Sequence, residues 1–340
     1  MIKIVTTLVL LVTVSFAEIN VITDRSDFHL KQIAKDFERE TGEKVNIFYT
    51  KKGLLQRTEV GNYDVIITKN SSEIVAAKER GLLKMLPSSM YHELDVNYKD
   101  KDFTWFNMSH RIRAFYVKKG MKNPPITYED LADPQYKGKI CIRKHTHNYN
   151  LELYGHLLAD MGKKNFVEWF KKFNSNLARK PSGNDRNQVK GVYLGECEVA
   201  IANTYYMGLM MNNPKQKAWA ESVDLIIPNQ EKVSKNSLIP DHYQFNECGA
   251  IAIHSGVAVL ANAKNDPEKF LKFLISDPVQ KGLSKNNFEY PLDPMNIAEV
   301  ANSFGKFQKL EYKDIKIRFS KQNDLYKLRK EVHKIIKTVK

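Results

Sequence analysis

Two adjacent tyrosines, Tyr205 and Tyr206, carry the most specific chemistry in this 340-residue sequence. They follow an apolar run at 198–202, which we interpret as a buried strand, and open α/β sheets place ligand-binding groups at strand ends. A phenolate oxygen is a hard donor suited to Fe³⁺. Because the ordinary tyrosine pKa is about 10, only a strongly Lewis-acidic ion deprotonates two phenols at neutral pH. The pair therefore indicates a site for a hard, highly charged cation.

Alternating strand and helix patterns must position these tyrosines. Near the N-terminus, an alternating run at 19–23 predicts a strand, and an apolar stripe with helical spacing follows it at 30–37. The other elements expected in this first block are strands at 44–49 and 64–68 and a helix at 54–60. Strands that alternate with helices form βαβ units around a parallel sheet.

A second block of the same kind begins near residue 140. The elements expected there are strands at 140–142 and 199–202 and helices at 151–160 and 166–173. Two further apolar runs, 111–117 and 249–253, predict strands that carry the chain to the second block and back. A chain that crosses twice between two α/β lobes has the architecture of a periplasmic binding protein, with its ligand in the cleft. We expect an α/β fold of this two-lobe kind (type 2), with central mixed sheets and a strand hinge.

The lobe boundaries follow from those crossings. We place the N-terminal lobe at 18–112 plus 247–299 and the C-terminal lobe at 113–246 plus 300–340. The segment 277–340 is predicted to be mostly helical, and its last part, 324–339, is a lysine-rich amphipathic helix.

The first seventeen residues predict export. A short positive start at Lys3 is followed by an apolar run at 4–14 and small residues at 15–17, the pattern of a cleaved signal peptide. The run is too short to span a bilayer, and we find no later segment apolar enough to do so. Cleavage after Ala17 leaves 323 residues (340 minus 17), enough for two lobes. We expect a monomer in the periplasm, without a membrane span in the mature protein.

The net charge of the chain is +14, and it falls to +13 without Lys3. Such a surface could attract nucleic acid or membranes. The lysines are nevertheless spread along the whole chain, without an arginine-rich tract or an aromatic RNA-binding signature. We therefore expect no nucleic-acid partner and interpret the charge as a solvated surface that helps to attract anionic iron chelates.

The three cysteines, Cys141, Cys197 and Cys248, are too few and too scattered for a disulfide framework. Cys141 and Cys197 lie in apolar, strand-like runs, so we expect buried free thiols. Oxidation of one pair stays open, because exported proteins meet an oxidising compartment.

A series of short motifs extends the case over nearly the whole chain. The motifs are 40–46, 81–83 (loosely), 128–132, 136–138, Pro181-Ser182-Gly183-Asn184-Asp185-Arg186-Asn187-Gln188, Gly195-Glu196, Asn203-Thr204-Tyr205-Tyr206-Met207-Gly208, 227–230 and Asn287-Phe288-Glu289-Tyr290-Pro291. Together they resemble the ferric-iron-binding periplasmic proteins of bacterial iron importers, in particular tyrosine-rich members that do not depend on external carbonate. The resemblance implies a non-enzymatic receptor that binds Fe³⁺ and hands it to an ABC transporter permease.

The resemblance also implies residue roles at matching positions. Tyr205 and Tyr206 would be two iron phenolates of the C-terminal lobe, and Tyr149 matches a third tyrosine ligand. Arg111 and Arg113 are similar to the family's Arg-x-Arg at the hinge, where a guanidinium offsets the charge of a phenolate or a bound anion. The sequence does not decide which arginine points inward. We favour Arg113, and a structural ion pair is the alternative for both.

The chain departs from the family pattern after the first strand. Arg25 is followed by Ser26 and Asp27 where family members carry His-Tyr, so the usual ligands of the N-terminal lobe are missing. Asp27 could supply a carboxylate oxygen, or simply favour the first turn of the helix through its dipole. His29 could reach the cleft or face solvent. Water, carbonate or a chelating anion would otherwise complete the iron shell.

Several alternatives stay open. His145 and His147 could join the shell beside Tyr149 and soften the site toward Fe²⁺ or another transition metal. A receptor of the same fold for an organic or oxyanion solute has no need for two ionised tyrosines. A basic surface protein that binds polyanions predicts steeply salt-dependent binding instead. Metalloprotease, nucleophile-elbow, phosphate-loop and Cys-x-x-Cys motifs do not occur, so we expect no enzyme.

Overall fold

The computed structural model describes residues 18–25, 27–230, 249–296, 315–318 and 322–339, except for the side chains of 27–29 and 322–324. Within these ranges nine strands form one sheet, in the order β2-β1-β3-β8-β4-β6-β5, with β7 paired to β4 and β9 to β8. The predicted signal peptide at 1–17 lies outside the described residues. Among the described helices, none is long and apolar enough to cross a membrane.

The first lobe contains the parallel strands β1 (Ile19–Thr23), β2 (Val45–Tyr49) and β3 (Val65–Ile67). Its helices are α1 (Asp27–Thr41), α2 (Leu54–Val60), α3 (Ser71–Glu79), α8 (Glu268–Ile275) and α9 (Asp277–Asn287). The stripe predicted at 30–37 is buried in the core of this lobe. Gly42 ends α1 with a φ of 75°, a left-handed conformation that glycine adopts without strain. The predicted elements of the first block are therefore confirmed.

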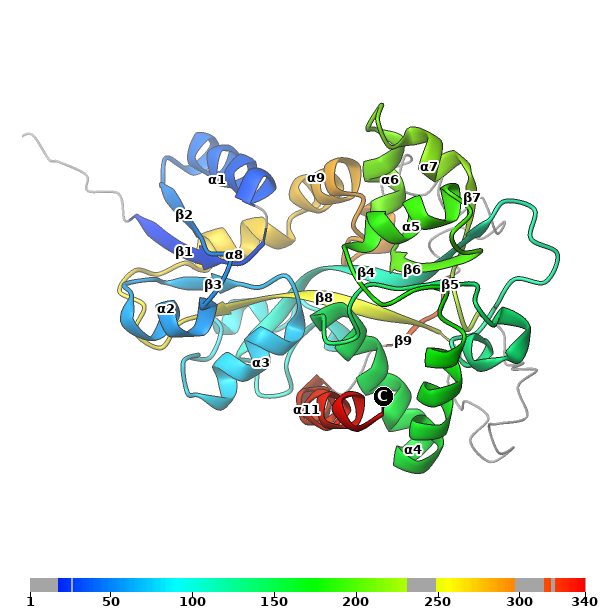
Figure 1. Ribbon diagram of the computed structural model, residues 1–340. Helices are drawn as coiled ribbons and strands as arrows, with labels where there is room; N and C mark the ends of the chain where they lie inside the picture. The colour runs from blue at the N-terminus through cyan, green and yellow to red at the C-terminus, as the bar shows by residue number, and fades with distance from the viewer. Residues whose placement is uncertain (1–17, 26, 231–248, 297–314, 319–321, 340) are drawn as a thin grey trace, which may run out of the picture.

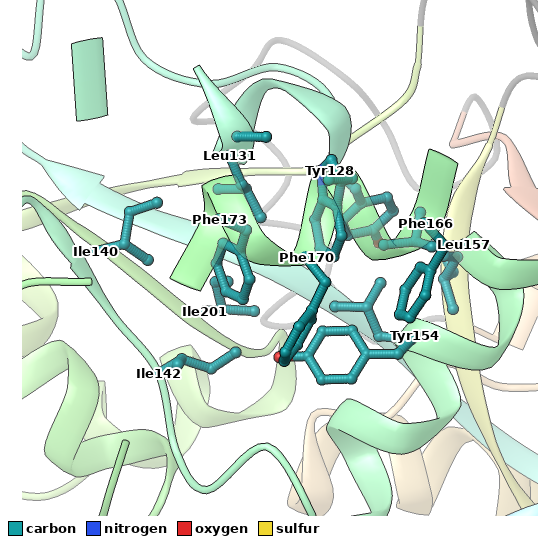
Figure 2. Packing of buried hydrophobic residues seen from close by; sticks show 14 of the residues in the cluster. Tyr128, Leu131, Ile140, Ile142, Tyr154, Leu157, Phe166, Phe170, Phe173 and Ile201 are labelled. Carbon is teal, nitrogen blue, oxygen red and sulfur yellow. The ribbon is translucent and has the colours of Figure 1, made fainter. Parts of the chain in front are cut away.

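The second lobe contains β5 (Ile140–Cys141), β6 (Val199–Asn203) and β7 (Val223–Ile226). Its helices are α4 (Asn148–Ser175), α5 (Asp185–Tyr193), α6 (Tyr205–Met211) and α7 (Lys217–Glu221). Two helices were expected within the span of α4, and a break at Gly162, with φ 71° and ψ 162°, separates them. Aromatic side chains from both sides of that break, including Tyr154, Phe166, Phe170 and Phe173, form the core of the lobe (Figure 2).

Two long strands, β4 (Trp105–Lys118) and β8 (Ala250–Val259), run through the middle of the molecule and join the lobes (Figure 1). The first part of β4 pairs antiparallel with β8, from Trp105 opposite Ala258 to Ile112 opposite Ala252. From Arg113 onward β4 pairs instead with β6. The core changes just before this point, since Met108 packs in the first lobe and Ile112 in the second. The predicted crossings at 111–117 and 249–253 are therefore present as a two-strand hinge.

The C-terminal helix α11 (Gln322–Thr338) confirms the helix expected at 324–339. It packs against both α4 and α3, so it lies across the two lobes on one side of the hinge (Figure 1). The remaining short elements are β9 (Ile317–Arg318) and 3-10 helices at Ser88–Met90, Val96–Tyr98, Glu129–Ala132, Pro134–Tyr136 and Pro294–Asn296.

One sequence expectation is wrong: Cys141 and Cys197 form a disulfide rather than two free thiols. Cys141 lies in β5 and Cys197 directly precedes β6, and these two strands pair in parallel. The pairing brings the two Cα atoms to 5.9 Å, within the usual range for a disulfide. Cys248 lies outside the described residues.

Candidate metal centre

Tyr205 and Tyr206 begin α6 directly after the turn that ends β6. The hinge strand β4 fixes this turn, because the hydroxyl of Tyr116 donates to the carbonyl oxygens of Asn203 and Thr204 at 2.7 and 3.1 Å. Tyr116 is fully buried. The backbone that carries both tyrosines is thus anchored to the hinge rather than to a surface loop.

Tyr149 approaches the same place from the first turn of α4. His147 caps that helix, since its ring Nδ1 accepts a hydrogen bond from the backbone N–H of Tyr149 at 3.2 Å. All three tyrosines line one pocket of about 420 Å³. The other residues around it are Arg25, Lys69, Arg111, Arg186, Leu209, Asn287 and Glu289. The structure therefore brings together the three tyrosines that the sequence singled out.

The environment keeps the phenols of Tyr205 and Tyr206 protonated when no cation is bound. The two rings lie with their centroids 4.1 Å apart. Burial raises the pKa of Tyr205 well above its ordinary value, and the charges of Tyr149 and Tyr206 raise it further. Burial and Tyr149 likewise raise the pKa of Tyr206. Two phenols this close do not both ionise unless a strongly charged cation lies between them.

Of the two arginines at 111 and 113, Arg111 is the one that lines this pocket. Its guanidinium carbon lies 5.7 Å from the ring centroid of Tyr149 and 6.0 Å from that of Tyr205. Burial alone would lower the pKa of Arg111, but Glu289, Tyr149 and Tyr205 outweigh that effect, so its pKa is raised. Arg111 is therefore a fixed positive charge beside two of the three phenols.

Arg113, which we favoured from the sequence, does not line the pocket. Its guanidinium donates to Asp185 at 2.7 Å, to Asn203 at 2.9 Å and to Asn150 at 2.8 Å, with Arg113 fully buried. These partners come from the starts of α5 and α4 and the end of β6. The geometry favours Arg111 as the residue beside a ligand, and gives Arg113 the structural ion pair that was the alternative for either.

The first lobe faces the tyrosines with positive charge. Arg25 donates to both carboxylate oxygens of Glu289, at 2.9 and 3.1 Å, and Arg111 lies 3.6 Å from the same carboxylate. The ammonium of Lys69 pairs with Asp24 at 2.9 Å. Counting Arg186 from the second lobe, the pocket has four cationic side chains and one carboxylate. Glu289 is already held by two arginines, so the pocket has an excess of positive charge.

The segment after α9 closes this wall of the pocket. Phe288 has a left-handed backbone conformation at the end of α9, and a Cβ placed on Gly208 in α6 would lie 2.2 Å from its ring. The absence of a side chain at Gly208 is therefore what allows α6 to approach this segment. The contact fixes Asn287 and Glu289 opposite the tyrosines.

Comparison with known proteins shows the family of this chain. The sequence profile of a family described as bacterial extracellular solute-binding protein matches residues 61–317. The chain is 35% identical over 304 residues to iron uptake protein A1 of Synechocystis, covering 86% of this chain and 80% of that protein. The chain belongs to the bacterial extracellular solute-binding proteins, in their ferric-iron-binding family.

Two solved structures of this family superpose on nearly the whole chain. One is a Trichodesmium protein, IdiA (FutA), in complex with iron and citrate ligands, with a TM-score of 0.82, 30% identity and coverage of 95% of this chain and 99% of that one. The other is the Bordetella ferric binding protein, with a TM-score of 0.82, 28% identity and the same coverage. The fold is thus that of the periplasmic binding proteins, as the sequence predicted, and the family is one of non-enzymatic solute-binding proteins.

The side chains of Asp27 and His29, the two candidates to replace the family's His-Tyr, lie outside the described part of the structure. The backbone of Asp27 begins α1, but the side chains of Asp27 and His29 are not described, and neither is Ser26. Their roles as iron ligands therefore stay predictions.

His145 and His147, which we considered as additional ligands in this family member, do not line the pocket. The ring nitrogens of His145 contact the hydroxyl of Tyr154 at 2.7 Å and the side-chain oxygen of Asn174 at 3.1 Å, in the core of the second lobe. Burial lowers its pKa to about 4. His147 caps α4 through Nδ1. Across the described ranges no group of three or more His, Cys, Asp or Glu could hold a metal ion.

The sequence did not indicate six of the pocket residues, which are Arg25, Lys69, Arg186, Leu209, Asn287 and Glu289. The sequence could have indicated Lys69 as a pocket residue. It follows the carboxyl end of a predicted strand, where open α/β sheets place ligand groups. Asn287 and Glu289 lie in one of the motifs that resemble the family, but only the packing of α9 against α6 assigns them to the pocket.

Proposed function

We propose that this chain captures ferric iron in the pocket between its lobes, through the phenolates of Tyr149, Tyr205 and Tyr206, and delivers it to an ABC permease. The observation that carries the proposal is the convergence of the buried Tyr149 and the half-buried Tyr205 and Tyr206 on one pocket, with Arg111 beside them. Phenolates are hard donors, and the raised pKa values of Tyr205 and Tyr206 mean that a weakly acidic metal would not displace their protons. Fe³⁺ is the cargo that suits this donor set.

The excess of positive charge in the pocket suggests what completes the iron shell. Arg25, Lys69 and Arg111 line the pocket together with the tyrosines, and their charges would repel a bare trivalent cation. An anion bound to the iron would be attracted to the same groups and could accept their hydrogen bonds. We therefore propose that iron is bound together with an anion or water from solution. The Trichodesmium relative, whose structure contains iron and citrate ligands, supports this reading.

We propose that the two lobes close over the iron by bending at β4 and β8. The lobes would be 18–112 plus 247–299 and 113–246 plus 300–340. The buried core changes from one lobe to the other close to this boundary, since Met108 and Val257 pack in the first lobe. Ile112 and Ala250, at the edges of the first-lobe ranges, already pack in the core of the second. Iron would dock first on the three tyrosines of the second lobe, and closure would add the first-lobe charges as a ligand-driven population shift. Reopening, protonation of the tyrosines or reduction to Fe²⁺ would release it.

The family and the N-terminal sequence together suggest where this happens. We propose that residues 1–17 are a signal peptide that is cleaved on export, and that the mature monomer works in the periplasm. A permease would then recognise the closed, iron-loaded form.

Equilibrium dialysis against radioactive ferric citrate tests the proposal. We expect the mature chain to retain about one iron per protein, and Tyr205→Phe to retain much less at the same iron concentration. Tyr193→Phe is the matched control, because this exposed tyrosine in α5 does not line the pocket. Equal retention by all three proteins would rule the phenolate site out.

The four cationic side chains of the pocket favour one second candidate, an oxyanion solute bound without iron. Dialysis against labelled citrate alone separates the two. Citrate retained equally with and without iron, and unaffected by Tyr205→Phe, would favour the oxyanion receptor.

A further inference from the structure

A second groove of about 500 Å³ lies between α11, α3 and α4, apart from the residues of the tyrosine pocket. Its apolar surface comes from Leu55 and Ala76 of the first lobe and from Leu151 and Tyr326 of the opposite side. A concave site of this size that combines apolar walls with a few polar groups is typical of small-molecule binding.

The positive charge in this groove comes from one face of α11. Arg329, Lys330, Lys334 and Lys337 all line it, whereas Glu73 is the acid among its lining residues. Lys330 already has partners, since its ammonium lies over the ring of Tyr326 at 4.1 Å and 4.0 Å from Glu79. Lys334 and Lys337 are exposed at the rim. The groove therefore favours a negatively charged occupant.

Arg329 is the group that points to a specific ligand. Its side chain is only 7% exposed, yet its Nε and Nη1 donate no hydrogen bond to any described residue. Its nearest carboxylate, that of Glu152, lies 4.0 Å from Nη1, beyond hydrogen-bond distance. The other oxygen of Glu152 accepts a hydrogen bond from Ser71 at 2.8 Å, which holds that carboxylate toward α3. The buried guanidinium therefore keeps an Nε–H without an acceptor, and its Nη1 is held only by the 4.0 Å ion pair with Glu152, so it can donate to one further anionic oxygen.

The scaffold around Arg329 is rigid enough for a preformed site. Val332 and Ile335, one and two turns further along α11, are buried in the core of the second lobe. A Cβ on Gly155 in α4 would lie 2.7 Å from Leu325, so the two helices are in close contact. On the other side, Tyr326 packs against the first-lobe core. Packing on both lobes holds the guanidinium at the floor of the groove.

We propose that this groove is a second ligand site, which binds a small amphipathic carboxylate with its head group on Arg329 and its alkyl chain along Leu55, Ala76 and Tyr326. Because its walls belong to both lobes, an occupant favours one separation of the lobes and is thereby coupled to the cleft. The site does not depend on iron binding, since it shares no residue with the tyrosine pocket.

Calorimetric titration of the full mature chain with octanoate tests the site. We expect saturable binding of about one octanoate per protein. Octanol and octyltrimethylammonium, which have the same chain length without the carboxylate, should bind about tenfold more weakly or worse. Absence of saturable octanoate binding, or equal binding of octanol, would overturn the proposal.

Variants on α11 locate the site. Arg329→Gln should weaken octanoate binding about tenfold or more, whereas Lys327→Gln should not change it, because Lys327 lies on the same helix but outside the groove. If Arg329→Gln does not fold, the double variant Lys334→Gln/Lys337→Gln, at exposed positions, should still weaken binding about threefold or more. Tyr205→Phe should bind octanoate normally, which separates this site from the iron site. Undiminished binding by a folded Arg329→Gln, or by the double variant, would refute the assignment.

Discussion

The guanidinium of Arg113 donates a hydrogen bond to the carboxylate of Asp185 at 2.7 Å, and both side chains are fully buried. The same carboxylate oxygen accepts the backbone N–H of Asn203 at 3.1 Å, and its other oxygen accepts from Arg143 at 3.2 Å. Arg113 also holds Asn150, next to Tyr149. This buried pair therefore links the two backbone segments that carry the tyrosines.

Asp185→Asn should destabilise the protein strongly, because it leaves the Arg113 guanidinium buried without its counter-charge. Removing one partner of a buried pair costs about 3–5 kcal/mol. Urea unfolding measures the effect. Glu221→Gln is the control, since it breaks the exposed pair with Lys217 and should cost less than about 1 kcal/mol. A similar, small loss in both variants would show that the Arg113–Asp185 pair does not hold the site together.

Arg111→Gln should weaken ferric iron binding, and we expect the variant to fold, so that its iron affinity can be measured. The guanidinium lies beside Tyr149 and Tyr205, and a charged partner is worth about 1.5–3 kcal/mol, which corresponds to a loss of about tenfold to a hundredfold in affinity. Competition with citrate at fixed iron gives the affinity. The exposed Arg57→Gln should bind as the wild type does, and an unchanged affinity for Arg111→Gln would contradict its role.

The sequence predicted those features that depend on the spacing of neighbouring residues, and it did not predict those that depend on contacts between distant segments. The periodicity of 30–37 and of 324–339 gave helices whose apolar faces are buried as expected. Periodicity could not show which of Arg111 and Arg113 points into the pocket, because residues two apart lie on the same face of a strand. Their neighbours distinguish them: Arg113 lies opposite Asn203 of β6, and Arg111 lies opposite Ile253 of β8.

The disulfide and the position of His145 both depend on tertiary contacts. The disulfide between Cys141 and Cys197 depends on the parallel pairing of β5 and β6, 56 residues apart in sequence. His145 was an alternative ligand beside Tyr149, but it lies before α4 and its ring packs in the aromatic core of the second lobe, against Phe170. Short-range spacing carries no information on such tertiary contacts.

Stability should fall as the pH rises from about 4.5 to 7, in part because of Glu129. Burial raises the pKa of this carboxyl from 4.5 to about 7. The unfolded chain therefore loses the proton first, and folding stability declines between these two pKa values. Glu129→Gln keeps an acceptor for Asn229 and should remove up to about 3 kcal/mol of that decline. Denaturant melts across this pH range check it, with the exposed Glu168→Gln as control. Parallel pH profiles for wild type and Glu129→Gln would contradict the assignment.

Replacing both disulfide cysteines, in Cys141→Ala/Cys197→Ala, should lower the free energy of unfolding by about 2–4 kcal/mol, because the bond closes a loop of 56 residues. Chemical unfolding with and without a thiol reductant measures it. Reductant should destabilise the wild type and leave the double variant unchanged. Equal sensitivity of the two proteins would show that this bond does not contribute.

The central claim is that Tyr149, Tyr205 and Tyr206 bind Fe³⁺ as phenolates, and a visible absorption titration of the metal-stripped mature protein with ferric citrate tests it most directly. The account predicts a phenolate-to-iron charge-transfer band that saturates at about one iron per protein and is lost in Tyr205→Phe and Tyr206→Phe but kept in Tyr193→Phe. A wild-type protein that stays colourless, or a band that survives in both variants, would contradict it.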